Sequence, residues 1–340
     1  MKKIILFTIL LVSICLLIFS LYRLDKMEIK ASDIRDITFS SGKNTLAGSL
    51  YLPNTQEPHK VVVFIHGDGA ADQTLQGGYN FIINHLLHSG YAVFSYDKAG
   101  VGASSGNWLE QSMKDRAEEV LQAIPTIKES IQIEAIGTLA FSQGGWVTSE
   151  LALADAPVDF YIVAGGAIDW MDQHLYYETG YAKSQGFSAA ETQKYLDYIK
   201  KSDAFVVAND YAGYQKYVKS YEYGQPMSQE RFNFAYINHT ANATKGIAKI
   251  QAPFLGLFGE EDINVDVQNS MSVYEKIFKE NGKTNYKLYL LKDANHELLD
   301  SKYNKNNDIV TFDAFLYGEK IFADGALDTL TYWLNKTLSQ

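Results

Sequence analysis

One serine in this sequence stands where a nucleophile could be held. Ser142 follows an apolar run and has small residues on both sides, Ala140 two positions before it and Gly144 two positions after it. This pattern predicts a strand that turns abruptly into a helix, with the serine in a strained backbone conformation that presents its hydroxyl. A glycine- and serine-containing loop that merely ends a strand has a similar composition, so the serine needs supporting residues elsewhere in the chain.

A nucleophilic serine requires a base to take its proton and an acid to orient that base. His296 is the candidate base, because it follows the segment 286–291, in which polar and apolar residues alternate as in a strand. The candidate acid is Asp262, which follows a second short apolar run at 252–258. Serine, acid and histidine therefore come in that order along the chain, each just beyond a predicted strand.

Other carboxylates compete with Asp262 for the role of the acid. Glu260, Glu261 and Asp266 lie in the same loop, which would otherwise be a solvated acidic cluster, and the spacing within the loop favours Asp262. Asp293 lies so close before His296 that it would have to fold back under its own histidine. We interpret Asp293 as a local loop residue.

Taken together, these motifs resemble the α/β-hydrolase superfamily and, within it, the bacterial serine esterases. The order of serine, acid and histidine is the order in that superfamily. Residues 60–69 resemble its strand and His-Gly loop, and residues 95–106 resemble its strand followed by an Asp-x-x-Gly-x-Gly-x-Ser loop. The likeness covers roughly residues 35–338 and implies an α/β fold with a mostly parallel central sheet and helices on both faces.

The resemblance also implies roles for individual residues. Ser142 would attack a carbonyl carbon, His296 would carry the proton, and Asp262 would fix the imidazole. The oxyanion would be bound by the backbone N–H groups of Gln143 and Asp68. Because the Asp68 carboxylate would repel an oxyanion, we expect it to turn to solvent or to a cation.

Two further residues of these motifs have structural interpretations. His66 is expected to brace its loop rather than to act as a second base. Asp97 is expected to end a strand and to tie the glycine loop that follows it.

Strands and helices alternate along most of the chain, which predicts a parallel sheet covered on both faces. Residues 34–53 read as a hairpin that opens the sheet, and helices are expected at 76–89, 113–128, 143–154, 267–281 and 326–338. The stretch 170–250 is too long for a simple crossover and predicts an inserted helical cap. The catalytic domain would then comprise residues 31–169 and 251–340, and Ser188 with Glu191 forms a candidate capping box inside the cap.

The cap is rich in tyrosine, whose ring suits a wall with one apolar side and one wet side. These rings either line a substrate pocket or pack the cap onto the core. Trp170 and Met171 are the better pocket candidates, because they enter the cap directly from a strand end beside the nucleophile. The tyrosines of the cap are Tyr176, Tyr177, Tyr181, Tyr195, Tyr198, Tyr211, Tyr214, Tyr217, Tyr221, Tyr223 and Tyr236.

Residues 1–30 form a separate segment with an apolar core. Residues 4–22 contain only three polar side chains and are long enough to span a bilayer as a helix. No small-x-small cleavage pattern follows, which favours a retained anchor over a cleaved export signal. Lys2 and Lys3 favour a catalytic domain outside the cytoplasm, and Cys15 is interpreted as a membrane-facing hydrophobe.

Composition limits the possible partners. Residues 1–30 carry five Lys/Arg and two Asp/Glu, so the net charge falls from −10 for the whole chain to −13 for the rest. Such an acidic body should not bind nucleic acid electrostatically. The sequence has no Cys/His cluster of metal-binding spacing and no phosphate-binding glycine loop, so no metal or cofactor is expected.

The sequence therefore predicts a membrane-anchored or exported serine hydrolase that acts on carboxylic esters through an acyl-enzyme. A serine peptidase or an acyltransferase could use the same three residues with a different pocket. A non-catalytic surface binding module is the alternative outside enzymes, and the full set of serine, acid and histidine disfavours it. The sequence leaves the identity of the ester, its acyl chain length and the oligomeric state open.

Overall fold

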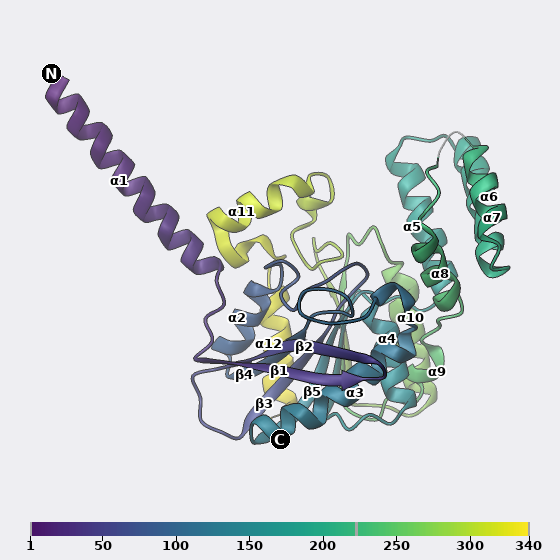
Figure 1. Ribbon diagram of the computed structural model, residues 1–340, viewed down its shortest axis with the longest axis horizontal. Helices are drawn as coiled ribbons and strands as arrows, with labels where there is room; N and C mark the ends of the chain where they lie inside the picture. The colour runs from purple at the N-terminus through teal and green to yellow at the C-terminus, as the bar shows by residue number, and fades with distance from the viewer. Residues whose placement is uncertain (1, 222–223, 339–340) are drawn as a thin grey trace.

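A single twisted sheet organises the computed structural model, which describes residues 2–221 and 224–338. In this part of the chain eight strands are arranged in the order β1-β2-β4-β3-β5-β6-β7-β8 (Figure 1). The β1–β2 and β2–β4 pairs are antiparallel, and all later neighbours are parallel. The strands are β1 (Asp33–Ser41), β2 (Asn44–Leu52), β3 (His59–Ile65), β4 (Tyr91–Tyr96), β5 (Ile133–Phe141), β6 (Phe160–Ala164), β7 (Phe254–Gly259) and β8 (Tyr286–Leu291). The predicted α/β-hydrolase fold is confirmed, as is the opening hairpin.

Helices cover both faces of the sheet because the central strands are apolar on both sides. In β3, Val61, Val63 and Ile65 face one core, whereas Val62 and Phe64 face the other. A strand buried on both faces needs such a continuous apolar run. The first core is closed by α3 (Met113–Ser130), α4 (Gly144–Leu153), α9 (Thr244–Ile247) and α10 (Val267–Glu280), and the second by α2 (Asn80–His88), α11 (Val310–Tyr317) and α12 (Ala326–Leu338).

Most of the expected helices are present, with one error at a boundary and one omission. The helix expected at 76–89 begins only at Asn80, because Leu75, Gln76 and Gly77 adopt positive φ angles and form turns instead. A helix at 310–317 was not expected, although this segment forms α11. Short 3-10 helices complete the connections: η1 (Trp108–Glu110), η2 (Ser301–Asn304), η3 (Asn307–Ile309) and η4 (Gly318–Ile321).

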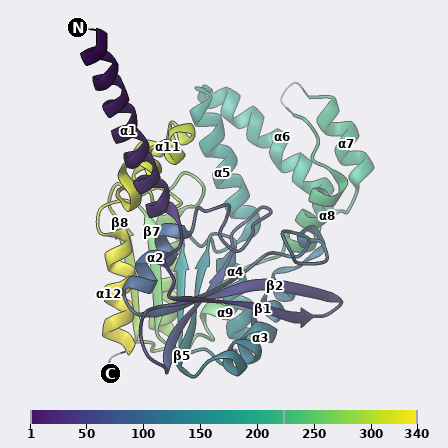
Figure 2. The same ribbon diagram turned by 60° about the vertical axis from the view of Figure 1, so that its left-hand side comes forward.

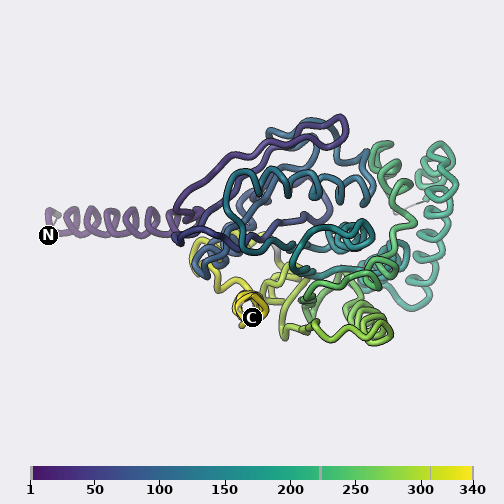
Figure 3. Tube along the Cα trace, turned by 90° about the horizontal axis from the view of Figure 1, so that it is seen from below, coloured from purple at the N-terminus to yellow at the C-terminus, as the bar shows by residue number. Residues whose placement is uncertain are grey.

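The long insertion after β6 forms a group of helices that stands off the sheet at the end of the molecule opposite α1 (Figures 1 and 3). The chain enters and leaves it side by side, because Trp170 N donates to Ala241 O and Ala243 N donates to Ile168 O. The expected capping box is present: the Ser188 side chain accepts from Glu191 N, and the Glu191 side chain accepts from Ser188 N. The helices are α5 (Trp170–Ser184), α6 (Ala189–Val207), α7 (Tyr211–Lys219) and α8 (Gln229–Asn238), whereas α9 packs against α4.

Most of the tyrosines in this insertion form its own small core. Tyr195, Tyr198 and Tyr214 are buried there with Phe232, and further rings stack around them. Tyr223 lies outside the described residues. Packing within the insertion therefore accounts for more of these rings than a substrate pocket does.

The first helix, α1 (Lys2–Met27), projects away from the body, and only its last turns contact it (Figures 1 and 2). An 18-residue window in its segment Lys3–Met27 has a mean hydropathy of 3.1, and the segment is long and apolar enough to cross a membrane. Phe19 packs edge-on against Phe315 of α11 at a ring distance of 6.3 Å. Farther along, Asn80 Nδ2 donates to Met27 O over 2.8 Å, so the end of α1 is built into the domain.

Candidate active site

Ser142 occupies a sharp turn between β5 and α4. Its φ angle is +51°, a strained value for a residue with a side chain. Its amide donates to Ala164 O on β6 over 2.8 Å, and its carbonyl accepts from Gly145 N over 2.9 Å. A Cβ added to Gly144 would lie 2.8 Å from Ile65 O and 3.2 Å from the methyl group of Ala140, so glycine is needed at 144 while alanine fits at 140.

His296 and Asp262 are joined by a short hydrogen bond at the end of the neighbouring strands. His296 Nδ1 lies 2.7 Å from Asp262 Oδ2. The other carboxylate oxygen of Asp262 accepts from Asn264 N and Val265 N over 2.7 and 2.8 Å, which fixes the carboxylate in place. This pair lies beside the serine, because Ser142 and His296 line the same two cavities.

The electrostatics of the pair favour a proton on the imidazole. Burial lowers the pKa of His296, but the hydrogen bond and the negative charge of Asp262 outweigh burial, so the pKa is raised above the ordinary value of 6.5. The side chain of Asp262 is fully buried. A buried carboxylate of this kind stabilises an imidazolium as it forms.

The competing carboxylates of the two loops cap a helix or face solvent. Asp266 caps α10, because its side chain accepts from Asn269 N over 3.0 Å. Glu260 and Glu261 are exposed. Asp293 lies in an exposed turn with a φ angle of +53°. None of these four carboxylates has a hydrogen bond to His296 among the described contacts, in contrast to Asp262.

The loop that holds Asp68 lies against Ser142. A Cβ on Gly67 would be only 3.3 Å from Ser142 Cβ, so the loop backbone passes directly beside the serine. Buried Lys98 fixes this loop by donating to Gly67 O over 3.1 Å and to Gly69 O over 2.8 Å. Gln143 is the N-cap residue of α4. The partial positive charge at the N-terminus of this helix therefore also lies beside Ser142.

A buried arginine links the two segments that carry Gln143 and Asp68. Arg116 on α3 donates to Gln143 Oε1 over 2.8 Å and to His66 O. Gln143 in turn donates from Nε2 to Asp68 Oδ1 over 3.2 Å. The side chain of Gln143 therefore sits between a cation and a carboxylate, and its backbone is held in one orientation.

The carboxylate of Asp68 is turned to a cation, which is one of the two expected arrangements. Arg231 of α8 forms a bidentate ion pair with it, at 2.8 Å from Nη1 to Oδ1 and 2.6 Å from Nη2 to Oδ2. Burial raises the pKa of Asp68, but the hydrogen bonds and the charge of Arg231 lower it by more, so the net pKa is below the usual value. Asp68 is therefore ionised and neutralised by a residue of the insertion.

His66 and Asp97 brace their loops, in agreement with expectation. His66 Nε2 donates to Tyr96 O over 2.6 Å, and the imidazole stacks on Tyr79. Burial lowers the pKa of His66 to about 3, so this histidine is neutral. Asp97 accepts from Gln73 N and Ala103 N over 2.8 Å each, which ties two loops together.

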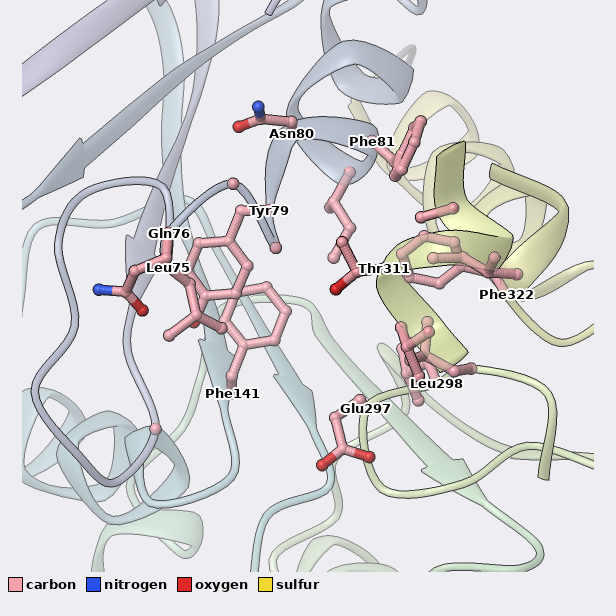
Figure 4. Close-up of a pocket in the computed structure, with 18 of the residues that line it drawn as sticks. Leu75, Gln76, Tyr79, Asn80, Phe81, Phe141, Glu297, Leu298, Thr311 and Phe322 are labelled. Atoms are coloured by element: carbon pink, nitrogen blue, oxygen red, sulfur yellow. The ribbon is translucent and has the colours of Figure 1, made fainter. Parts of the chain in front are cut away.

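Two cavities meet at Ser142 and His296. The larger, of about 700 Å³, is lined mainly by apolar residues from the turn before α2, the end of α1 and α11 (Figure 4). The other, of about 480 Å³, lies under the insertion and is lined by Trp170 and Met171 together with charged residues of α5, α6 and α8. The two residues expected to line a pocket thus do so, and the larger cavity was not foreseen. Within the described residues, no group of three or more His, Cys, Asp or Glu side chains is placed to hold a metal ion.

Three cations of the site could not be assigned from sequence. Lys98 follows Asp97 in the glycine loop, and nothing in that motif indicates that its ammonium turns back to the other loop. Arg116 lies in an amphipathic helix, where a charged residue usually faces solvent. Arg231 is 163 positions from its partner Asp68. The only signal was the unbalanced carboxylate of Asp68 itself.

Fold and site together define an α/β-hydrolase. The chain belongs to the Hydrolase_4 family, described as serine aminopeptidase S33, whose sequence model matches residues 56–302. It is 23% identical over 289 residues to esterase EstD of Thermotoga maritima, an alignment that covers 82% of this chain and 63% of EstD.

Solved structures of similar fold include several esterases. Esterase Pf2001 of Pyrococcus furiosus matches with a TM-score of 0.57 and 15% identity over 90% of this chain and 91% of that chain. A highly thermostable carboxyl esterase of Bacillus coagulans matches with a TM-score of 0.57 and 15% identity over 91% of this chain and 99% of that chain. At such identities the likeness establishes the fold.

Proposed function

We propose that this protein is a serine hydrolase that cleaves carboxylic esters through an acyl-enzyme. The observation that carries the proposal is the 2.7 Å contact between His296 Nδ1 and Asp262 Oδ2, beside a serine in a strained turn. A histidine oriented in this way by a buried carboxylate is the arrangement that activates a serine hydroxyl. The names of EstD, Pf2001 and the Bacillus coagulans enzyme favour an ester, whereas the family description names an aminopeptidase.

Each residue has a defined part in the reaction. Because Asp262 engages Nδ1, Nε2 of His296 is the nitrogen that takes the proton from Ser142 as Oγ bonds to the carbonyl carbon. The ester C–O bond then breaks, and the departing alcohol receives that proton. Water, deprotonated by His296, attacks the acyl-enzyme and releases the carboxylic acid and the free serine.

The developing oxyanion would be bound by the backbone N–H groups of Gln143 and Asp68. Gly67 lies against Ser142, and the loop is fixed by Lys98 on one side and by Arg116 through Gln143 on the other. Donors held in place before the reaction lower the barrier, typically by about 3 kcal/mol for each donor. Neutralisation of Asp68 by Arg231 removes the repulsion that its carboxylate would exert.

We assign the first helix as a retained membrane anchor. The residues just beyond its apolar core belong to the folded domain: Arg23 Nε donates to Phe315 O, and Lys30 N donates to Asn84 Oδ1 over 2.7 Å. Cleavage near the end of α1 would remove part of the cavity wall, since Leu24 and Met27 line the larger cavity. Because Lys2 and Lys3 precede the apolar core of α1, the catalytic domain (residues 31–169 and 251–340) and its cap (residues 170–250) would lie outside the cytoplasm. Resistance of the full-length protein to carbonate extraction from membranes tests this assignment, and recovery of a chain lacking residues 1–22 in the medium contradicts it.

The catalytic proposal is tested on the full-length protein in detergent. We expect hydrolysis of p-nitrophenyl butyrate and labelling by a fluorophosphonate probe, both abolished by Ser142→Ala. Ser184→Ala, at the exposed end of α5, is the matched control and should retain both. Labelling that persists in Ser142→Ala would exclude Ser142 as the nucleophile. Hydrolysis of peptide amides but not of esters would identify a peptidase. The absence of both labelling and turnover in the wild type would identify a binding module.

A further inference from the structure

The larger cavity joins the nucleophile to the end of the membrane helix. Ser142 and His296 are in its lining, and so are Leu24 and Met27 of α1 and Glu28 just after it. Much of the remaining wall comes from the turn before α2, from α11, and from Phe141, Leu298 and Phe322 (Figure 4). A cavity that serves the chemistry is therefore partly built by the segment that would cross the bilayer.

The helix α11 lies where the bilayer surface would be. It packs on α1 at Phe19, near the end of the apolar segment, and at Arg23, just beyond that segment. Two of its aromatic side chains point to solvent, Phe312 at 62% exposure and Tyr317 at 54%. Exposed aromatic residues beside the end of a membrane helix are typical of the interface between lipid and water. With α1 in a membrane, α11 and the cavity that it borders face the acyl chains.

The volume of the larger cavity and the charged side chains of the other fit the two halves of an amphiphile. The larger is lined by apolar side chains such as Phe141, Leu298 and Phe322, and its volume is about 700 Å³. A methylene group occupies close to the share of one water in the liquid, so a 16-carbon chain needs roughly 500 Å³. The cap-side cavity also has apolar residues such as Trp170 and Met171 in its lining, but it adds charged side chains, namely those of His174, Glu178, Asp203 and Arg231.

The inference from these cavities rests on the proposed ester hydrolysis and names the class of its substrate. The geometry points to a long-chain acyl ester of a membrane amphiphile as the substrate, with its acyl chain entering the larger cavity from the bilayer between α1 and α11. The polar alcohol part occupies the cavity under the cap, and the scissile carbonyl lies at Ser142, where the two cavities meet. A soluble short-chain ester would reach the same serine without filling the larger cavity.

The test compares p-nitrophenyl butyrate and p-nitrophenyl palmitate, which share a leaving group, with the full-length protein reconstituted in phosphatidylcholine vesicles. Thr311→Trp places a bulky ring in the cavity from an exposed position of α11. Lys320→Trp adds the same ring at an exposed position outside the cavity and is the control. We expect Thr311→Trp to lower palmitate hydrolysis about tenfold while butyrate hydrolysis by both variants stays within twofold of wild type.

A second variant tests entry from the bilayer. Phe312→Ser/Tyr317→Ser should lower palmitate hydrolysis in vesicles several-fold, leave palmitate hydrolysis in detergent micelles unchanged, and leave butyrate hydrolysis unchanged in both. Equal loss on both esters, or no loss on palmitate in either variant, overturns the inference. Absence of butyrate hydrolysis by the wild type would instead refute the proposed function itself, so the two failures are distinguishable.

Discussion

Arg231 and Asp68 form a bidentate ion pair that connects α8 of the insertion to the loop beside Ser142, with N–O distances of 2.8 and 2.6 Å. Arg231 also lies over the ring of Phe234, its neighbour in α8, at 5.0 Å. This contact therefore links the position of α8 to the charge beside the proposed oxyanion site, while Asn238 also holds α8 by accepting from Met113 N and donating to Gln111 O. Any displacement of α8 that breaks this pair leaves an uncompensated carboxylate at the site.

The first prediction concerns this charge. Arg231→Leu leaves Asp68 ionised and unpaired, so the oxyanion is repelled and kcat should fall about fivefold, equivalent to about 1 kcal/mol for a partly exposed pair. Adding Asp68→Asn in the same chain should restore kcat to within twofold of wild type. Steady-state kinetics of the two single variants and the double variant measure the coupling directly.

Salt provides an independent control for the same pair. Exposed charges are screened, so the defect of Arg231→Leu should shrink when the ionic strength is raised to about 0.5 M. A double variant as impaired as Arg231→Leu, together with a defect that salt does not change, would show that Arg231 acts only by holding α8.

The second prediction concerns pH. His296 must be neutral to accept the proton from Ser142, and Asp262 raises its pKa above 6.5 against the effect of burial. The acidic limb of kcat/KM should therefore have its midpoint above pH 6.5, with activity lost as the pH falls through it. Asp262→Asn removes the charge that raises the pKa and should lower kcat by about 10⁴-fold.

The titration of His296 itself can be followed where turnover is too slow. NMR of Ser142→Ala and of Ser142→Ala/Asp262→Asn should show a lower imidazole pKa in the double variant. An unchanged pKa would mean that Asp262 does not set the protonation of His296.

The sequence alone was sufficient to predict the fold and the candidate triad because both depend on local signals. Ser142, Asp262 and His296 each follow a short apolar segment that forms a strand, and parallel strands bring their carboxyl ends to one edge. The small residues at 140 and 144 also mark the turn in the sequence, although the reason for Gly144 is its close approach to Ile65 O of β3.

The remaining parts of the site depend on contacts between distant segments. Asp68 needed a neutralising partner, but the identity of Arg231 follows only from how α8 packs over the loop. The larger cavity arises where α11 meets the end of α1, and neither segment carries a motif for it. Periodicity also gave no signal for α11, which is only eight residues long and is apolar on most sides.

The third prediction concerns a histidine that joins two helices of the cap. His174 Nε2 lies 3.3 Å from Glu178 Oε1, and its Nδ1 lies 3.2 Å from Asp203 Oδ1 on α6. Burial lowers the pKa of His174, but the two carboxylates outweigh it and raise the pKa to about 9. A pKa raised above the unfolded value of 6.5 gives stability that is fully present below pH 6.5 and is lost as the pH rises through about 9.

His174→Gln removes this contribution while keeping a polar side chain of similar size. The difference in Tm between wild type and His174→Gln should be largest below pH 6.5 and should decrease towards pH 9 and above. A difference that stays constant over this range would show that His174 stabilises the cap by packing alone.

The last prediction concerns the turn that holds Ser142. A methyl group on Gly144 would come within 2.8 Å of Ile65 O, a backbone atom that cannot rotate away, so Gly144→Ala must displace either the turn or β3. Overpacking of this kind costs about 1–3 kcal/mol of stability, and a shift of about 1 Å at a nucleophile lowers the rate about 10²-fold. Gly180→Ala, in the middle of α5, is the matched control, because the nearest contact of its methyl group would be Ile263 O at an ordinary 3.4 Å and alanine favours a helix. Urea unfolding and ester hydrolysis should show losses of both stability and kcat/KM for Gly144→Ala and of neither for Gly180→Ala, and full activity of Gly144→Ala would mean that the turn does not need a glycine there.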